Sequence, residues 1–147
     1  MKRGVSLLLI MLIVAACSSQ KPDVYVLDLG DVYIEQAITA KDELVTEIAS
    51  TTTVDYEAAQ IPDKEAAQAF VDRYLQEVID LYETVEGMSI EYDIKDDHLT
   101  YTATVDFTTL EAGDYEVVRI DADVKQGEDL YLDDLIDTLE AEGYERK

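Results

Sequence analysis

The chain has 147 residues, with 34 Asp and Glu side chains against 11 Lys and Arg, which gives a net charge of −23 at pH 7. This balance argues against nucleic-acid binding, because such binding depends on Lys and Arg at the phosphates. The length predicts one domain, and a hydrophobic fraction of 48% is too high for a wholly disordered chain.

The chain begins like an exported protein. Lys2 and Arg3 precede a short apolar run from Val5 to Ala16. A helix that spans a bilayer needs roughly twenty residues, so the run predicts a cleaved signal peptide. Cys17, the only cysteine, follows Val14-Ala15-Ala16, and these four residues resemble the lipobox of bacterial lipoprotein precursors. The resemblance implies cleavage before Cys17 and a diacylglyceryl thioether on its sulfur; the alternatives are an ordinary signal peptide followed by a chance cysteine, and a plain transmembrane anchor.

These features divide the chain into a signal peptide (1–16), a lipidated cysteine with a short tether (17–23), and a single α+β domain (24–147). Two acyl chains hold a protein at a membrane without spanning it, and the tether reaches only about 16 Å. We therefore expect a protein that is lipid-anchored to the bacterial cell membrane on its extracytoplasmic side. Ser18 does not favour retention in an inner membrane, which predicts the outer membrane in a host that has one.

Lipidation and charge limit the chemistry that the mature protein can perform. Removal of Lys2 and Arg3 with the signal peptide takes the net charge from −23 to −25, which disfavours contact between the folded domain and anionic lipid. With Cys17 lipidated, no thiol remains for a disulfide, a cysteine metal site or a cysteine nucleophile. The acidic surface is most simply that of a well-solvated envelope protein; the functional alternative is a surface for cations or a basic envelope partner.

The first part of the domain, from Val24 to Tyr56, is predicted to form three strands. Turns are expected at Leu29-Gly30-Asp31 and at Ala40-Lys41-Asp42. Alternation predicts one buried face on each of the longer strands. That face is expected to carry Val32, Ile34 and Ile38 on one strand and Leu44, Thr46, Ile48, Thr52 and Val54 on the next.

A long helix is predicted between Asp63, a good N-cap residue, and Gly87, which ends it. Apolar residues recur at helical spacing, namely at Ala67, Phe70, Val71, Tyr74, Leu75, Val78, Ile79, Tyr82 and Val85. At this spacing a stripe is more often core than the wall of a ligand pocket. We expect it to pack on the sheet, with Tyr74, Val78 and Ile79 buried against Ile90, Tyr92, Tyr101 and Val105.

A β-hairpin is predicted around a turn at Asp96-Asp97, because both arms alternate strictly between apolar and polar residues. The buried face is expected to hold Met88, Ile90, Tyr92 and Ile94 on one arm and Leu99, Tyr101, Ala103, Val105 and Phe107 on the other. The solvent face carries a row of hydroxyls beside two carboxylates: Thr100, Thr102 and Thr104 with Glu91 and Asp93. Such a row is a candidate surface for glycans or peptides, although hydroxyl rows are more often ordinary strand residues that face water.

The last part of the chain is predicted to hold a short strand at Tyr115–Ile120, an acidic loop at Asp121–Asp129 and a helix from about Leu132 to Glu142. Gly143 followed by Tyr144 fits a left-handed C-cap with a hydrophobic contact after it. The fold class is therefore α+β, with the order β-β-β-α-β-β-α along the chain. One antiparallel sheet is expected to carry both helices on one face.

Catalytic and metal-binding motifs are sparse in this sequence. His98, the only histidine, follows the hairpin turn, where a solvated side chain is the simpler reading. No serine elbow, phosphate loop or paired-histidine helix is present. Four carboxylates offer oxygen ligands of the kind that calcium takes: Asp121, Asp123, Glu128 and Asp129. Their spacing departs from the EF-hand pattern, because Lys125 occupies a ligand position and Gly127 is one residue late, so no metal or cofactor is predicted.

Three segments resemble the YehR-like family of small bacterial lipoproteins. They are Glu86–Tyr92 with the turn at Asp96-Asp97, the strand Thr102–Asp106, and the tail Leu139–Tyr144. The resemblance implies an α+β lipoprotein of uncharacterised function, so no functional residue except Cys17 is carried over. Family members are implied to be richer in lysine than this chain, which makes a shared charged ligand doubtful.

Two classes of function follow from these observations. The first is a membrane-anchored, non-catalytic binding or accessory module of the envelope, which contacts the membrane through the Cys17 lipid and attracts a basic partner or cations. The alternative is a divalent-cation-binding protein or a carboxylate-based hydrolase. A cluster of buried carboxylates with displaced pKa values would favour the enzyme, and a smooth acidic surface favours the binding module.

Overall fold

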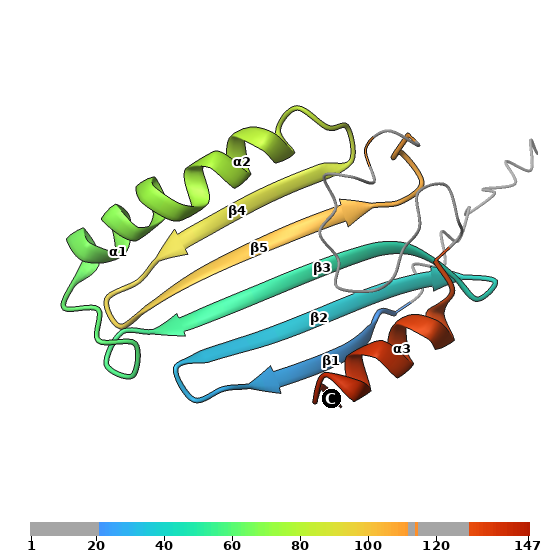
Figure 1. Cartoon of the computed structure of the whole chain (residues 1–147), viewed down its shortest axis with the longest axis horizontal. Helices are drawn as coiled ribbons and strands as arrows, with labels where there is room; N and C mark the ends of the chain where they lie inside the picture. The colour runs from blue at the N-terminus through green and yellow to red at the C-terminus, as the bar shows by residue number, and fades with distance from the viewer. Residues whose placement is uncertain (1–20, 112–113, 115–129) are drawn as a thin grey trace, which may run out of the picture.

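A six-stranded antiparallel sheet with helices on one of its faces makes up the protein, seen here as a computed structural model (Figure 1). The structure describes residues 21–111, 114 and 130–147. The strands are β1 (Asp23–Asp28), β2 (Val32–Lys41), β3 (Leu44–Asp55), β4 (Met88–Ile94), β5 (His98–Asp106) and β6 (Glu145–Arg146). The helical segments are α1 (Lys64–Phe70), η1 (Val71–Leu75), α2 (Gln76–Tyr82) and α3 (Leu132–Ala141).

The strand order across the sheet is β4-β5-β3-β2-β1-β6. The α+β class, the three early strands, the long helix, the hairpin and the last helix are thus confirmed. The sequence analysis missed β6, whose two residues pair with β1 as Tyr25↔Arg146 and Val26↔Glu145. A two-residue charged segment has no alternation to detect, so its pairing becomes visible only when the C-terminus is placed beside β1.

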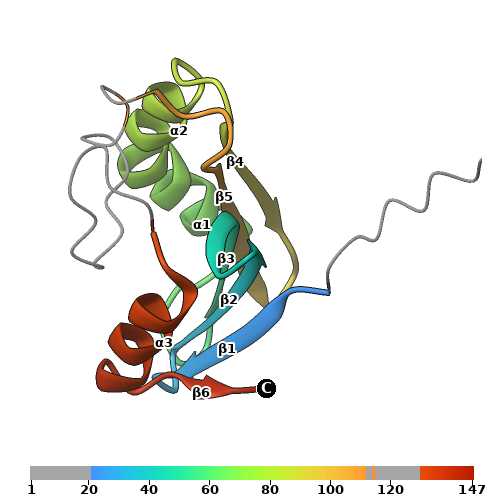
Figure 2. The same ribbon diagram turned by 90° about the vertical axis from the view of Figure 1, so that its right-hand side faces the viewer.

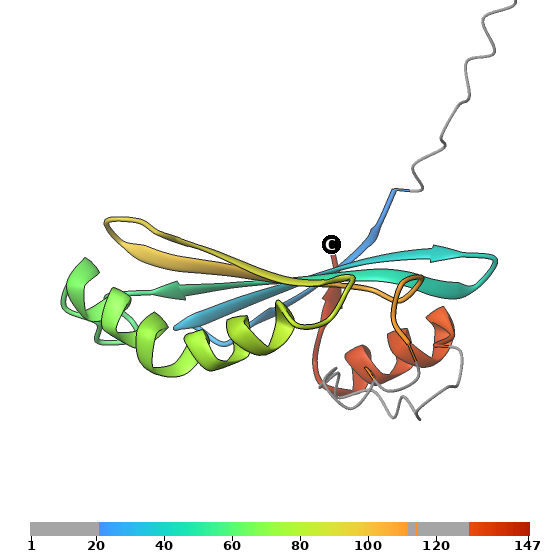
Figure 3. The ribbon, with the colours of Figure 1, turned by 90° about the horizontal axis from the view of Figure 1, so that it is seen from above.

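Both helices lie on the same side of the sheet, as predicted. Figures 2 and 3 show the long helix, α1 to α2, alongside β4 and β5, with α3 beneath the other end of the sheet near β1 and β2. The opposite face of the sheet is covered by no element in the described part of the chain.

The core fills the space between the sheet and the helices in neighbouring clusters. The cluster under α3 consists of Tyr25, Ile38, Val45, Ile48, Leu135, Leu139 and Tyr144. The cluster under the long helix consists of Val54, Tyr56, Ala67, Val71 and Leu99. Leu99 and Val71 have no exposed surface. Full burial of such a side chain contributes about 1.5–3 kcal/mol.

A β-bulge changes the predicted pattern on β3. The register shifts between Thr39 and Ala40, so that Ala40 pairs with Val45 while Thr39 pairs with Glu47. Two residues of β3 then oppose one of β2, which reverses the faces of the residues before the bulge. Val45 is therefore in the core, and the prediction that Leu44 and Thr46 share the buried face of Ile48 is wrong.

The β2–β3 hairpin turns at Asp42-Glu43, one to two residues later than the predicted turn at Ala40-Lys41-Asp42. Asp42 and Glu43 occupy the turn with φ of 53° and 69°, and Lys41 pairs with Leu44. Two positive φ values are typical of a two-residue type I′ turn, whose twist matches that of the strands. The turn at Gly30 is where the sequence placed it, with φ of 90°.

The long helix starts as predicted but contains an irregular turn. Asp63 caps it, because its Oδ1 accepts a hydrogen bond of 2.9 Å from the backbone N–H of Ala66. Residues Val71–Leu75 then form a π-helical segment, in which the N–H of Gln76 donates to the carbonyl of Val71, five residues earlier. A π turn inserts one residue relative to an α-helix.

That inserted residue rotates the rest of the helix relative to the sheet, so that Tyr74 and Val78 turn away from the core. After Ala67 and Val71, the residues that face the sheet are Leu75 and Ile79. Tyr74 is 58% exposed and Val78 is 37% exposed, so the prediction that both are buried is wrong, whereas Ile79 is buried as expected.

The β4–β5 hairpin has the predicted turn and the predicted faces. Tyr92 pairs with Tyr101, and Met88 pairs with Val105. Leu99 and Val105 are buried. Tyr92 is 42% exposed because β4 is the edge strand, so the prediction that Tyr92 is buried is wrong. The tail after α3 also behaves as predicted, because Gly143 has φ of 95° and the ring of Tyr144 is buried. The N–H of Tyr144 donates to the carbonyl of Leu139 at 2.9 Å. This bond and the one from the N–H of Gly143 to the carbonyl of Glu140, at 3.1 Å, are those of a Schellman motif.

Gly87 joins the long helix to β4, and we expect Gly87→Ala to destabilise the fold by about 2–5 kcal/mol. Its φ is +87°, and an added Cβ would lie 1.8 Å from the Oγ1 of Thr109 and 3.0 Å from the carbonyl oxygen of Asp106. Gly30→Ala is the control, because φ is +90° there and nothing lies within 4 Å; backbone strain alone should cost about 1–2 kcal/mol. Urea unfolding measures the stability of both variants. Equal losses of unfolding free energy would mean that the side chain of Thr109 moves away from the added Cβ at no cost.

The buried tyrosines predict a loss of stability at alkaline pH. Burial is the main cause that raises the pKa of Tyr25, Tyr56 and Tyr82 above the usual value of 10.0. The folded state then keeps protons that the unfolded state releases, so the stability is complete below pH 10 and falls as pH rises through the folded pKa values. Urea unfolding between pH 8 and pH 11.5 should show this fall, and Tyr82→Phe should reduce it. An unfolding free energy that stays constant over this range would contradict the prediction.

Candidate functional site

The predicted row of threonines lies on the uncovered face of the sheet. Thr100, Thr102 and Thr104 are half-buried residues of β5, and they alternate with the core residues Leu99 and Val105. The row therefore faces away from both helices, as the alternation of the hairpin predicted.

Tertiary structure adds two more hydroxyls that the sequence analysis did not assign to this surface. Antiparallel pairing of β3 with β5 places Thr51 opposite Thr102 and Thr53 opposite Thr100. The Oγ1 atoms of the first pair are 3.0 Å apart, and those of the second are 3.5 Å apart. The run Thr51-Thr52-Thr53 indicated a strand, but nothing local could show that its outer residues lie beside β5.

A carboxylate stands at each end of the Thr51–Thr102 pair and at one end of the Thr53–Thr100 pair. In register across four strands, Glu91 of β4 lies opposite Thr102, Thr102 opposite Thr51, and Thr51 opposite Glu35 of β2. Asp93 likewise lies opposite Thr100. We call this surface the Thr face, and it consists of Thr51, Thr53, Thr100, Thr102, Thr104, Glu35, Glu91 and Asp93.

Two lysines partly neutralise the rim of the Thr face. The Nζ of Lys147 lies 2.7 Å from the Oε2 of Glu35, and this hydrogen bond raises the pKa of the lysine. Lys95 forms an ion pair with Asp93. Glu91 has no ion pair among the described residues. These pairs are exposed, so each contributes little to stability.

The carboxylates of the hairpin turn are engaged with side chains of the chain itself. Asp96 lies 2.6 Å from the Nζ of Lys64 at the start of α1, and this hydrogen bond lowers the pKa of Asp96. The Oδ1 of Asp97 lies 2.6 Å from the Nδ1 of His98. In the described ranges, no group of three His, Cys, Asp or Glu side chains is arranged to hold a metal ion.

Other residues singled out by the sequence lie outside the described residues. These are Cys17, the carboxylates Asp121, Asp123, Glu128 and Asp129, and the strand expected at 115–120. Between residues 21 and 147, gaps aside, no helix has both the length and the apolar character that a bilayer crossing requires.

Comparison with known proteins adds the family and the fold. Residues 22–145 match the profile of a family described as "Protein of unknown function (DUF1307)". An uncharacterized lipoprotein of Listeria monocytogenes, Lmo0207, is 23% identical over 98% of this chain and 95% of its own length. These matches accord with the resemblance to YehR-like lipoproteins that the sequence suggested.

Two solved structures share the fold. The NMR structure of the Escherichia coli YehR protein superposes with a TM-score of 0.70 at 13% identity, over 86% of this chain and 89% of that one. The NMR structure of a protein from Streptococcus pneumoniae superposes with a TM-score of 0.60 at 17% identity, over 100% and 98% of the two chains.

Proposed function

Since this chain belongs to the DUF1307 family of proteins of unknown function, we propose that it is a lipid-anchored envelope lipoprotein that binds a basic partner on the Thr face without catalysing a reaction. The similarity to a lipoprotein along nearly the whole chain supports the anchor. The lipobox supports an extracytoplasmic position. Ser18 supports the outer membrane in a host that has one.

The proposed binding role rests on one observation, the cross-strand row Glu91–Thr102–Thr51–Glu35. Its hydroxyls donate and accept hydrogen bonds, and its carboxylates select positive charge. The net charge of −23 attracts a basic partner over a longer range and speeds the encounter. A basic segment laid across the strands would meet a carboxylate, two hydroxyls and a second carboxylate in turn.

The spacing of the same row argues against catalysis. Glu35 and Glu91 are three strands apart, which at the usual strand spacing is about 14 Å. Paired carboxylates that act on one bond lie within about 10 Å of each other. The row therefore suits an extended ligand better than a single reacting atom, and it makes the hydrolase the weaker reading.

Photo-crosslinking in intact cells tests the proposal in the full chain. A photoreactive amino acid at Thr102 should give a discrete adduct, whereas the same group at Gln76, exposed on α2, should give none. Glu35→Lys with Glu91→Lys should lower the yield at Thr102 at least tenfold, because like charges in contact cost several kcal/mol.

The matched control is Glu77→Lys with Glu83→Lys, two exposed positions on the long helix and at its end that give the same change in net charge. This control should keep the adduct. An equal loss in both double variants would mean that diffuse charge alone attracts the partner. If the adduct still forms after Glu35→Lys with Glu91→Lys, the Thr face is not part of the binding site.

A further inference from the structure

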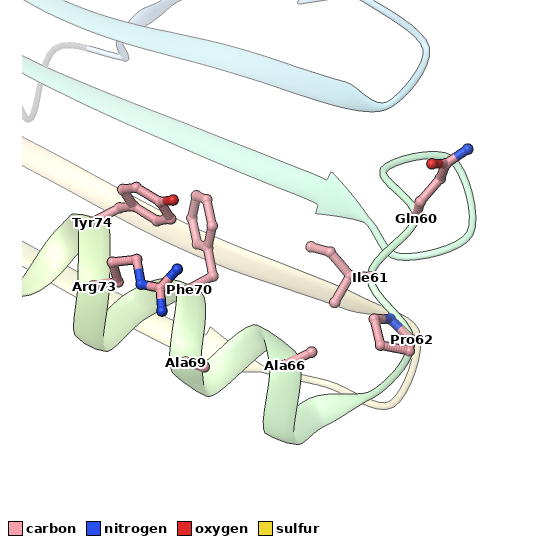
Figure 4. Close-up of a pocket in the computed structure, with 8 residues that line it drawn as sticks. All are labelled: Gln60, Ile61, Pro62, Ala66, Ala69, Phe70, Arg73 and Tyr74. Atoms are coloured by element: carbon pink, nitrogen blue, oxygen red, sulfur yellow. The ribbon is translucent and has the colours of Figure 1, made fainter.

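A groove of about 320 Å³ lies beside the first half of the long helix, on the helix-bearing side of the sheet. Figure 4 shows the loop residues Ile61 and Pro62 on one side of it and Ala66, Phe70, Arg73 and Tyr74 of the helix on the other. The volume is at the lower end of the range for small-molecule sites. The two alanines on this helix face, Ala66 and Ala69, leave room beside the rings.

Arg73 gives the groove a positive charge that no carboxylate neutralises through an ion pair in the described part of the chain. There, Lys64, Lys95, Arg146 and Lys147 each form an ion pair with a carboxylate, whereas the exposed Lys21 and Lys41, away from the groove, form none. Arg73 forms no such pair; its guanidinium lies 6.0 Å from the centre of the Tyr74 ring. None of the residues that line the groove is acidic, although 34 of the 147 residues are Asp or Glu.

Two aromatic rings form the apolar part of the groove. The rings of Phe70 and Tyr74 are 5.1 Å apart and tilted by 47°, and Figure 4 shows both projecting from the helix toward the strands. Tyr74 is nevertheless 58% exposed. An exposed ring next to a second ring provides a ledge on which a planar or apolar group can stack.

The π-helical segment creates this arrangement. In an unbroken α-helix, Tyr74 would share the buried stripe with Ala67 and Val71, which is what the sequence predicted. With the residue inserted at Val71–Leu75, Leu75 keeps its place in the core, whereas Tyr74 leaves the stripe and lines the groove with Arg73. A π turn is strained relative to an α-helix and is frequent at functional sites, so its position at the groove is a second observation that points to a ligand.

We propose that the groove binds a small ligand that carries one carboxylate or phosphate next to a ring. The planar guanidinium of Arg73 matches both anions through two parallel hydrogen bonds. The ring of the ligand stacks on Tyr74, and its size is limited by the wall formed by Ile61 and Pro62. This site takes the charge opposite to that of the Thr face, and it does not depend on the proposal made for that face.

Ligand-observed NMR on the lipidated full-length protein in nanodiscs tests the site. Phenyl phosphate and phenylacetate are the probes, and the stronger of the two identifies the anion. Ligands of this size should bind with a Kd on the order of 1 mM. Benzyl alcohol, which lacks the charge, and inorganic phosphate, which lacks the ring, should each bind at least tenfold more weakly.

Arg73→Gln should weaken binding of both aromatic anions at least tenfold. Tyr74→Ala should reduce phenyl phosphate to the affinity of inorganic phosphate. Both side chains are exposed, so the fold should survive, which circular dichroism checks. Lys95→Gln is the matched control, since it removes one positive charge elsewhere, and it should bind as wild type does. Absence of binding at 10 mM probe, or an equal loss in Arg73→Gln and Lys95→Gln, would overturn the proposal.

Discussion

Val71→Asp is expected to unfold the protein. The side chain of Val71 has no exposed surface and packs in the cluster that contains Val54, Ala67 and Leu99. A carboxylate at this position would be buried without a partner, which costs several kcal/mol. The total stability of a domain is only about 5–15 kcal/mol, so a thermal melt followed by circular dichroism should show no cooperative transition.

Val78→Asp is the matched control, since it makes the same substitution two turns later on the same helix. Val78 is 37% exposed, so the new carboxylate stays in water and the melting temperature should change by only a few degrees. In an α-helix without the π segment, Val78 would face the core together with Val71, and both variants would unfold. A cooperative melt that survives in Val78→Asp and is lost in Val71→Asp therefore tests the inserted residue directly.

Replacement of Cys17 by Ser should release the protein from the membrane. Each methylene of a lipid chain contributes about 0.8 kcal/mol on insertion, and two chains anchor a protein stably where one binds only reversibly. Without the thiol no thioether can form, so the variant should appear in the soluble fraction or as an unprocessed precursor. Membrane fractionation with mass spectrometry of the N-terminus distinguishes these forms.

Ser19→Ala is the control for the anchor, because it changes the tether and leaves Val14-Ala15-Ala16-Cys17 intact. This variant should sediment with membranes as the wild type does. A Cys17→Ser variant that sediments equally well would show that the lipobox reading is wrong and that another segment holds the protein at the membrane.

Features set by neighbouring residues could be predicted from the sequence. Asp63 caps the helix through a bond to a residue three positions away, and the Schellman motif at Gly143 closes over five residues. The hairpin turn at Asp96-Asp97 and the faces of β5 follow from strict alternation. In each case the stabilising contacts lie within one turn or one pair of strands, so the local pattern contains the necessary information.

Features set by distant parts of the chain needed the tertiary structure. Thr51 meets Thr102 because β3 pairs with β5, and β6 exists because the C-terminus reaches β1. The bulge opposite Ala40 and the π segment at Val71–Leu75 each insert one residue into a regular element. The local pattern does not indicate either insertion, because each depends on how much apolar surface the whole sheet and the helix bury together. The Thr row was therefore visible in the sequence, whereas the four-strand row and the groove at Arg73 were decided by packing.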